Sequence, residues 1–323
     1  MSRICRRRFV LAAVALLIMR PAVAQQAGRI YRVGVLFDGG SSTWGPYREA
    51  LRERLAPQGF VEGRNLHTIW RGGTGYRHED REAARALVAA RPDAILAFSS
   101  SMTQAVQWAT KTVPIVFANV GDPIADGIVE SYARPGGNVT GVSTRNRQLL
   151  AKRFELLREL LPEAKRIAYV RPPFSDPAVT ASEALARDIA ARLGFELIVS
   201  DGVGQIGDLE AKRPEAMLVY FVLGTRLTTE NLIATAARLR IPTVFADAES
   251  VTLGGLAAYG TNPVANTRLA ADLLARVLNG ASPAEIPVDQ AARFELVINM
   301  KTAKAIGLTI PQSILLRADR VIE

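Results

Sequence analysis

Short apolar segments alternate with amphipathic ones along most of this chain, and this alternation limits its fold more than any other feature. Tyr31–Phe37, Ala94–Phe98 and Ile115–Ala118 are apolar almost throughout. Segments such as Pro46–Ala56 and Met102–Thr110, which have the length and composition of helices, lie between them. Strands that are apolar on both faces are typical of a parallel sheet covered by helices on both sides. We therefore predict an α/β fold.

The same alternation continues through the second half of the chain. Asn146–Leu161 begins it with Leu150, Phe154, Leu157 and Leu161, which recur at the spacing of one helix face. The further strands we expect are Leu66–Arg71, Val139–Ser143, Ile167–Val170, Glu196–Ser200, Ala216–Phe221, Thr243–Phe245, Leu256–Tyr259 and Phe294–Asn299, and the further helices are Glu79–Ala90, Ala178–Leu193, Leu227–Leu239, Val264–Leu278 and Thr302–Ile306.

The first 24 residues have the layout of a secretory signal peptide. Arg3 and Arg6–Arg8 precede an apolar run, Phe9–Met19, and the small residues of Ala22–Ala24 stand before Gln25. The run of roughly 11 residues is too short for a membrane span, which needs about 20. We expect cleavage after residue 24 and export to the periplasm by the Sec route or, since Arg6-Arg7 also fits it, the twin-arginine route.

Cysteine and histidine are too scarce for several kinds of site. The only cysteine, Cys5, lies inside the signal segment. The rest of the chain therefore has no disulfide, thiol nucleophile, Cys-ligated metal or lipid-bearing cysteine, so we do not expect a lipoprotein. His67 and His78 are too few and too far apart for a histidine-rich metal site. We expect no metal and no cofactor.

The net charge of +9 overstates how basic the exported protein is. Without the five arginines of residues 1–24, 35 basic residues face 31 acidic ones. No run of Lys and Arg is interleaved with aromatic residues, which is the usual pattern of nucleic-acid binding. We therefore expect no nucleic-acid partner.

One long motif carries a resemblance to a known family. Pro114–Ser143 reads PIVFANVGDPIADGIVESYARPGGNVTGVS. This stretch, with Leu150–Pro162 and Arg293–Pro311, resembles the ABC transporter substrate-binding proteins of the tryptophan/tyrosine (aromatic amino acid) family. The resemblance covers nearly all of the chain after residue 30. It implies the type I periplasmic binding fold, in which two doubly wound parallel-sheet lobes are joined by a hinge of three crossovers.

Breaks that contain Pro or Gly suit those three crossovers. They fall after Val142, near Tyr259–Pro263 and at Ser282–Gln290. We expect one lobe from residues 25–142 with 262–288, and the other from 143–261 with 289–323. The resemblance further implies a monomeric periplasmic protein, not an enzyme, that binds a small organic solute, an amino acid or aromatic carboxylate, between its lobes. It would deliver this solute to an ABC permease in the inner membrane.

Candidate ligand-binding residues of the first lobe follow its expected strands, because ligands of open α/β sheets lie beyond the carboxyl ends of the strands. They are Ser41, Trp44, Ser99, Ser100, Ser101, Asn119 and Asp122. Hydroxyls and backbone N–H groups at a helix start favour a carboxylate. Alternatively, Ser100 or Ser101 is only an N-cap, and Asp122 only caps a helix whose first residue is Pro123. Trp44 either stacks on a ligand or closes a loop against its own lobe.

In the second lobe the corresponding candidates are Ser143, Arg171, Phe221 and Asp247. Here the chain departs from the family pattern, which usually has a small polar residue in place of Arg171 and an Asp where Leu223-Gly224 stands. Asp247 and Glu249 remain as partners for a cationic group. Arg171 points to a carboxylate or another anion, or alternatively is a solvated rim residue.

One other class of protein stays open, and a second is disfavoured by the N-terminal segment. An exported α/β enzyme would use carboxylates such as Asp122 and Asp247, although neither has a recognisable activating neighbour. The pattern Gly202-Val-Gly204-Gln-Ile-Gly207 lacks the full helix and the acidic residue that a dinucleotide site requires. The effector domain of a cytoplasmic regulator would need a DNA-binding helix-turn-helix in place of the signal segment.

Overall fold

Two sheets built from similar runs of strands and helices make up the protein from Tyr31 to Glu323. The computed structural model describes residues 28–38, 41–74, 77–171, 177–201, 209, 211–220, 226–291 and 293–323. Tyr31–Glu323 form one unit, and Met1–Ile30 form another. Among the described residues, no helix has the length and apolar composition that a membrane span requires.

The first sheet has the strand order β11-β5-β4-β3-β1-β2, and all of its pairings are parallel. Side chains alternate between its two faces, so that Val33 and Val35 belong to one apolar cluster and Leu36 to another. The strands are β1 (Tyr31–Asp38), β2 (Leu66–Gly73), β3 (Ala94–Phe98), β4 (Ile115–Val120), β5 (Val139–Ser143) and β11 (Asp289–Gln290).

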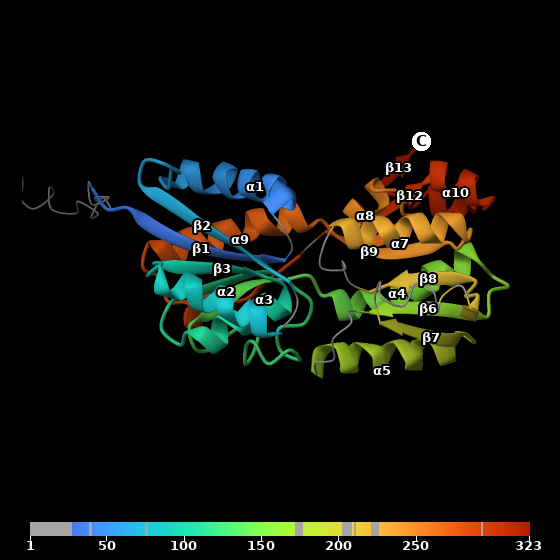
Figure 1. Cartoon of the computed structure of the whole chain (residues 1–323), viewed down its shortest axis with the longest axis horizontal. Helices are drawn as coiled ribbons and strands as arrows, with labels where there is room; N and C mark the ends of the chain where they lie inside the picture. Colours follow the sequence, from blue (N-terminus) through green and yellow to red (C-terminus); the bar gives the residue numbers. More distant parts are fainter. Residues whose placement is uncertain are drawn as a thin grey trace, which may run out of the picture. The chain divides into compact units, whose positions relative to one another are not determined.

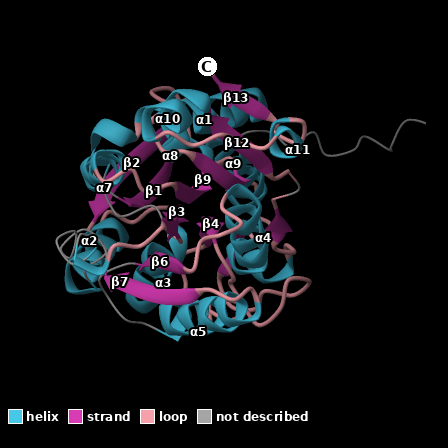
Figure 2. Ribbon diagram, turned by 90° about the vertical axis from the view of Figure 1, so that its right-hand side faces the viewer, coloured by secondary structure: helices cyan, strands magenta, loops and turns pink. Residues whose placement is uncertain are grey.

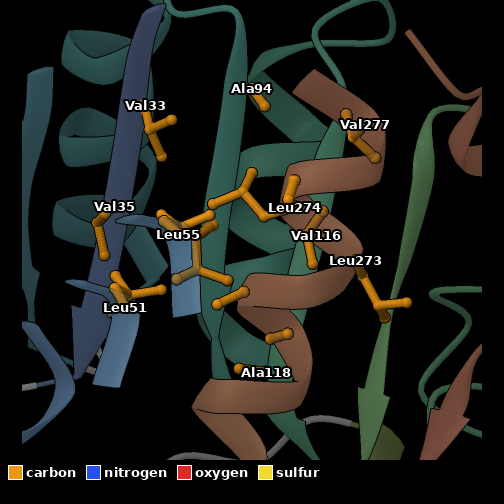
Figure 3. Packing of buried hydrophobic residues seen from close by; sticks show 14 of the residues in the cluster. Val33, Val35, Leu51, Leu55, Ala94, Val116, Ala118, Leu273, Leu274 and Val277 are labelled. Carbon is orange, nitrogen blue, oxygen red and sulfur yellow. The ribbon is translucent and has the colours of Figure 1, made fainter. Parts of the chain in front are cut away.

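Helices cover both faces of this sheet. On one face α1 (Gly45–Leu55) and α9 (Pro263–Leu278) lie side by side (Figure 1). Leu274 of α9 packs there in one cluster with side chains of α1, β1 and β4 (Figure 3). On the other face lie α2 (Arg77–Ala89) and α3 (Ser99–Ala109). Short 3-10 helices connect the elements at Ser41–Thr43, Ala56–Gln58 and Pro283–Glu285.

The second sheet has the order β13-β12-β10-β9-β8-β6-β7. Only β10 and β12 pair antiparallel among its described strands. The strands are β6 (Arg166–Arg171), β7 (Glu196–Asp201), β8 (Ala216–Val219), β9 (Thr243–Asp247), β10 (Ala257–Thr261), β12 (Glu295–Asn299) and β13 (Arg320–Ile322).

This sheet, too, is covered on both faces. One apolar cluster joins it to α4 (Asn146–Leu160) and α5 (Pro177–Arg192), the latter beside β6 and β7 (Figure 2). The same cluster includes side chains of α10 (Met300–Ile306) and α11 (Gln312–Leu315). The opposite face packs against α7 (Arg226–Arg238) and α8 (Ala248–Thr252). The predicted α/β architecture of two doubly wound lobes is confirmed.

The two lobes repeat the same strand order, β2-β1-β3-β4-β5 in the first and β7-β6-β8-β9-β10 in the second. The repetition extends to a detail of the last pair in each run. The register shifts after Phe117 in the first lobe and after Ala258 in the second. A Cβ on Gly141 would lie 2.2 Å from the Phe117 carbonyl oxygen, and one on Gly260 would lie 1.8 Å from that of Ala246. Only glycine permits these two close approaches.

The chain passes between the two sheets after β5, after β10 and after β11. Two of these connections are joined to each other, because Gln290 pairs with Ser143 and the Ala291 N–H donates to the Ser143 carbonyl at 2.9 Å. Ser143 and Asp289–Gln290 lie in the first sheet, whereas the expected boundaries place them in the second lobe.

The segment after β4 differs from the expectation. Residues 123–127 form a turn and not a helix. The Asp126 N–H donates to the Asp122 carbonyl as in a helix, but Gly127 then takes a φ of 67° and ends the turn. The prediction of a helix beginning at Pro123 is therefore wrong, because the left-handed Gly127 stops it after one turn.

Candidate functional site

The carboxyl end of β4 carries two of the predicted residues, and the structure gives them different surroundings. Asn119 has a left-handed φ of 60°. Its side chain accepts a hydrogen bond from Asn266 at 2.8 Å and donates to the Pro263 carbonyl at 3.3 Å. Asn266 also donates to the Thr261 hydroxyl at 3.0 Å. Asn119 thus ties β4 to the second crossover.

Asp122 reaches toward the second lobe. One oxygen accepts the Ala125 N–H at 3.2 Å, which caps the turn. The other lies 3.4 Å from Nη1 of Arg147, a residue in the first turn of α4. Nη2 of Arg147 lies 3.8 Å from Asp126, whose carboxylate also accepts the Ser100 hydroxyl. Two carboxylates of the first lobe therefore face one guanidinium of the second.

The three serines after β3 open helix α3 rather than cap it. The residue at the N-cap position is Phe98, and no side-chain cap bond forms there. Ser99 is buried with a φ of 58°, and its hydroxyl lies 3.2 Å from that of Ser101. The N-cap alternative for Ser100 and Ser101 is therefore wrong, since both lie inside the first turn.

The loop after β1 places Trp44 against its own lobe. Its ring stacks on that of Trp70 at 5.4 Å, and the Arg48 guanidinium lies over both rings at 5.3 and 4.9 Å. The indole Nε1 is buried without an acceptor in the described part of the chain. Ser41 is exposed in the 3-10 helix before it. Of the alternatives for Trp44, the structure shows the one in which the loop closes on its own lobe.

In the second lobe, Arg171 lies at the end of β6 with two acidic neighbours. Its Nε is 3.1 Å from Glu183, and its Nη2 is 2.6 Å from Asp201. Its side chain is 15 % exposed, so it is not a solvated rim residue. Ser143 is wholly buried at the first crossover, where the Arg145 N–H donates to its hydroxyl at 3.3 Å. Phe221 and the Gly202–Gly207 pattern lie outside the described residues.

Asp247 is a buried N-cap. Its two oxygens accept the Ser250 N–H and the Ser250 hydroxyl, both at 2.9 Å. Burial raises the pKa of Asp247 above its ordinary value, although these hydrogen bonds and the charge of Arg153 oppose the shift. Arg153 is itself 1 % exposed, and burial lowers its pKa to about 10. It donates to the Tyr259 carbonyl at 2.7 Å.

A pair of tyrosines, Tyr169 and Tyr220, lies near several of these charged groups. The Tyr220 hydroxyl hydrogen-bonds to Ser182 at 2.7 Å, and its ring lies 5.7 Å from that of Tyr169. The Tyr169 hydroxyl is buried with no partner among the described residues. Burial raises the pKa of Tyr220, and the charges of Arg147 and Asp126 act on it in opposite directions. The described residues contain no group of three or more His, Cys, Asp or Glu side chains suited to a metal.

The sequence interpretation missed Arg147, Arg153 and the two tyrosines. A signal for both arginines was available, because each lies three positions from Leu150 on the apolar face of α4, Arg147 before it and Arg153 after it. A basic residue in the first turn of a helix also opposes the helix dipole, so Arg147 needs acidic neighbours. The described residues therefore place fixed charges and buried hydroxyls near the strand ends.

Comparison with known proteins places the chain in a family. Residues 45–322 match the ABC transporter substrate binding protein family. A tyrosine-binding protein of Clostridioides difficile (strain R20291) is 28 % identical over 269 residues, which cover 81 % of this chain and 76 % of that protein.

Solved structures agree with the fold. The crystal structure of a conserved domain protein from Vibrio cholerae O1 biovar eltor superposes with a TM-score of 0.80 at 28 % identity, covering 91 % of this chain and all of that one. An ABC domain from Streptococcus pneumonia, in complex with L-Trp, superposes with a TM-score of 0.79 at 24 % identity over the same shares. The type I periplasmic binding fold is thus confirmed. This chain belongs to the ABC transporter substrate-binding protein family.

Proposed function

We propose that the protein is the periplasmic solute-binding component of an ABC importer. It binds a small organic solute between its two lobes and passes this solute unchanged to a permease in the inner membrane. The family consists of substrate-binding proteins and not enzymes, so the alternative of an exported enzyme is wrong. The internal hydrogen bonds of Asp247 are consistent with this, because they leave that carboxylate in a capping role.

The family match over residues 45–322 carries the proposal, together with two lobes joined by paired crossovers. In such a protein the ligand contacts both lobes and thereby shifts the population toward the closed form. Asn119 and Ser143, which hold the crossovers in hydrogen bonds, would then set the hinge. We expect Ser100 and Asp122 to contact the ligand from the first lobe.

We propose an aromatic amino acid as the ligand class. A relative that aligns over 81 % of this chain is a tyrosine-binding protein, and a structural relative holds L-Trp. The candidates Ser41, Ser99, Ser101, Arg171 and Phe221 remain proposed contacts, whereas Trp44 packs on Trp70 of its own lobe. The departures from the family pattern at Arg171 and at Leu223-Gly224 lie in the second lobe, and we expect them to change affinity among amino acids.

Isothermal titration and thermal shift on the purified mature protein test this proposal. We expect micromolar binding and a raised melting temperature with L-tyrosine or L-tryptophan, and little response to sugars. Mass spectrometry of the small molecule that copurifies should identify the same class. An amino-acid panel without any response, or chemical conversion of the ligand, would contradict it.

Export and assembly form a separate part of the proposal. We propose cleavage after residue 24, a soluble periplasmic monomer, and passage by the Sec or the twin-arginine route. Intact-mass measurement on the periplasmic fraction should give the mass of a chain that begins at Gln25. Replacement of Arg6-Arg7 by Lys-Lys distinguishes the two routes, since only twin-arginine export should stop.

A further inference from the structure

Arg147 has unused hydrogen-bonding capacity. A guanidinium offers five N–H donors. In the described part of the chain, Arg147 makes no hydrogen bond, its Nε is buried, and its nearest acidic atoms lie 3.4 and 3.8 Å away. Buried donors in native proteins nearly always have acceptors, so a donor without one requires an explanation.

The position of Arg147 suggests that explanation. It lies at the start of α4, just past the first crossover, while Asp122 belongs to the turn after β4 of the first lobe. The side chains are 19 % and 27 % exposed, so solvent and a ligand can reach both. The electrostatic influence of Arg147 on Tyr220 also places it near the hydroxyl pair of Tyr220 and Ser182.

The charges of this pair select a particular ligand. A ligand with a carboxylate alone would take Arg147 and leave Asp122 without its counter-charge, and one with an ammonium alone would do the reverse. Removing one partner of a partly buried ion pair is costly because the other charge stays desolvated. A zwitterion supplies a counter-charge to both, so it can enter between them without leaving either uncompensated.

Arg171 is less suited to this task. Its Nε and Nη2 already face Glu183 and Asp201 at 3.1 and 2.6 Å, so two carboxylates offset its charge. Arg147 also faces two acids, Asp122 and Asp126, but a ligand carboxylate would have to displace closer acidic contacts at Arg171 than at Arg147. The acidic contacts of Arg147, at 3.4 and 3.8 Å, are longer than those of Arg171.

We propose that Arg147 and Asp122 together bind the head of an α-amino acid. Arg147 donates to the α-carboxylate, and Asp122 accepts from the α-ammonium, in place of the loose ion pair between them. This inference rests on the proposed function and assigns the specificity of its site to two named residues.

The test is a cycle of protein variants against ligand analogues. Isothermal titration at pH 7 compares L-tyrosine with tyramine, which lacks the carboxylate, and with 3-(4-hydroxyphenyl)propionate, which lacks the ammonium. L-Tryptophan, tryptamine and indole-3-propionate form a parallel series. The proteins are wild type, Arg147→Gln, Arg147→Lys and Asp122→Asn, with Arg171→Gln to test the competing arginine. Arg187→Gln, at an exposed ion pair of the same lobe, is the matched control. Circular dichroism confirms that each variant is folded.

In Arg147→Gln we expect amino-acid affinity to fall about 10- to 100-fold while the amine changes by less than about threefold. Asp122→Asn should weaken binding of the amino acid and leave the affinity for the propionate analogue, which lacks the ammonium, nearly unaffected. Arg147→Lys should lose less than Arg147→Gln, because a lysine keeps the charge but not the paired donors. Arg187→Gln should leave every affinity unchanged, and Arg171→Gln should preserve the ratio of amino-acid affinity to amine affinity.

The outcomes separate the two proposals. If wild type binds an amino acid, and Arg147→Gln or Arg147→Lys weakens the amino acid and the amine equally, the assignment of Arg147 is overturned. If instead Arg171→Gln abolishes the preference for the amino acid over the amine, the carboxylate is bound by Arg171 and the assignment of Arg147 is overturned. If wild type binds no member of either series, the proposed function fails first, and the head-group assignment fails with it.

Discussion

Two carboxylates stand at equivalent places in the two lobes, and one helix faces both of them with an arginine. Asp122 follows β4 in the first lobe, and Asp247 ends β9 in the second. Each caps the turn after its strand. Arg147 of α4 faces Asp122, whereas Arg153 of the same helix is close enough to Asp247 that each shifts the pKa of the other.

The two sets of charged residues differ in how exposed they are and in whether they are hydrogen-bonded within one lobe. Asp247 and Arg153 are 5 % and 1 % exposed and hydrogen-bond within their own lobe. Asp122 and Arg147 are partly exposed, lie in different lobes and meet only at ion-pair distance. A similar arrangement of residues thus stabilises the fold in the second lobe and remains open to another partner between the lobes.

Removal of Arg153 should cause the largest loss of stability. Arg153→Gln should lower the free energy of unfolding by about 3 kcal/mol, because it removes the charged donor to the buried Tyr259 carbonyl and a favourable charge near Asp247. Arg147→Gln, at a partly exposed pair, should lower it by about 0–1 kcal/mol. Urea unfolding at pH 7 measures both. Equal losses would show that the two pairs are not different in kind.

The glycine pair should show where the two lobes are alike. Gly260→Ala and Gly141→Ala each force a Cβ against a carbonyl oxygen, at 1.8 and 2.2 Å, so each should cost about 1–3 kcal/mol or more. The matched control is Gly45→Ala, which meets nothing within 4 Å. It should change the melting temperature little. A large effect at one strand pair and none at the other would break the equivalence of the lobes.

The pH dependence of stability should carry the signature of Asp247. Because burial raises its folded pKa above the ordinary 3.8, the folded state binds this proton more tightly than the unfolded chain does. The contribution of Asp247 to the free energy of unfolding therefore falls as pH rises from about 4 through the raised pKa. Asp247→Asn, which keeps an N-cap acceptor, should remove this fall. The readout is the difference in unfolding free energy between variant and wild type across that range.

Glu215 provides a control of opposite sign. The backbone N–H groups of Arg166 and Lys165 donate to its carboxylate and lower its pKa. Its contribution is present above the ordinary pKa of 4.5 and is lost as pH falls through the lowered value. Glu215→Gln should therefore reduce the amount by which the free energy of unfolding falls at acidic pH. The same sign of change in both variants would contradict the buried state of Asp247.

Continuous apolar runs predicted the strands well, because a strand that is buried on both faces of a sheet needs apolar side chains on both of its sides. The expected bounds of Ala94–Phe98 and Val139–Ser143 agree with β3 and β5 to the residue. The turn after β4 could not be predicted as reliably, because Asp122-Pro123 is a good helix start whether or not Gly127 ends it one turn later.

The candidate site was predictable in position more than in chemistry. Asn119, Asp122, Arg171 and Asp247 do lie at strand ends. Which of them is engaged inside the protein depends on partners far away in sequence, such as Asn266 for Asn119 and Asp201 for Arg171. The hydrophobic periodicity and the composition of the sequence do not indicate such pairings, because they form only when the chain is folded.

Helix α9 follows the strands β6 to β10 of the second lobe in the chain, yet it covers the first sheet. A ribosome must therefore translate the whole of residues 146–261 before it adds the segment that closes the apolar face of β1, β3 and β4. Until then the nascent first lobe exposes the part of that face that α9 covers, and exposed apolar surface of this kind favours chaperone binding and aggregation. The order of translation thus keeps the first lobe incomplete until the chain is nearly finished.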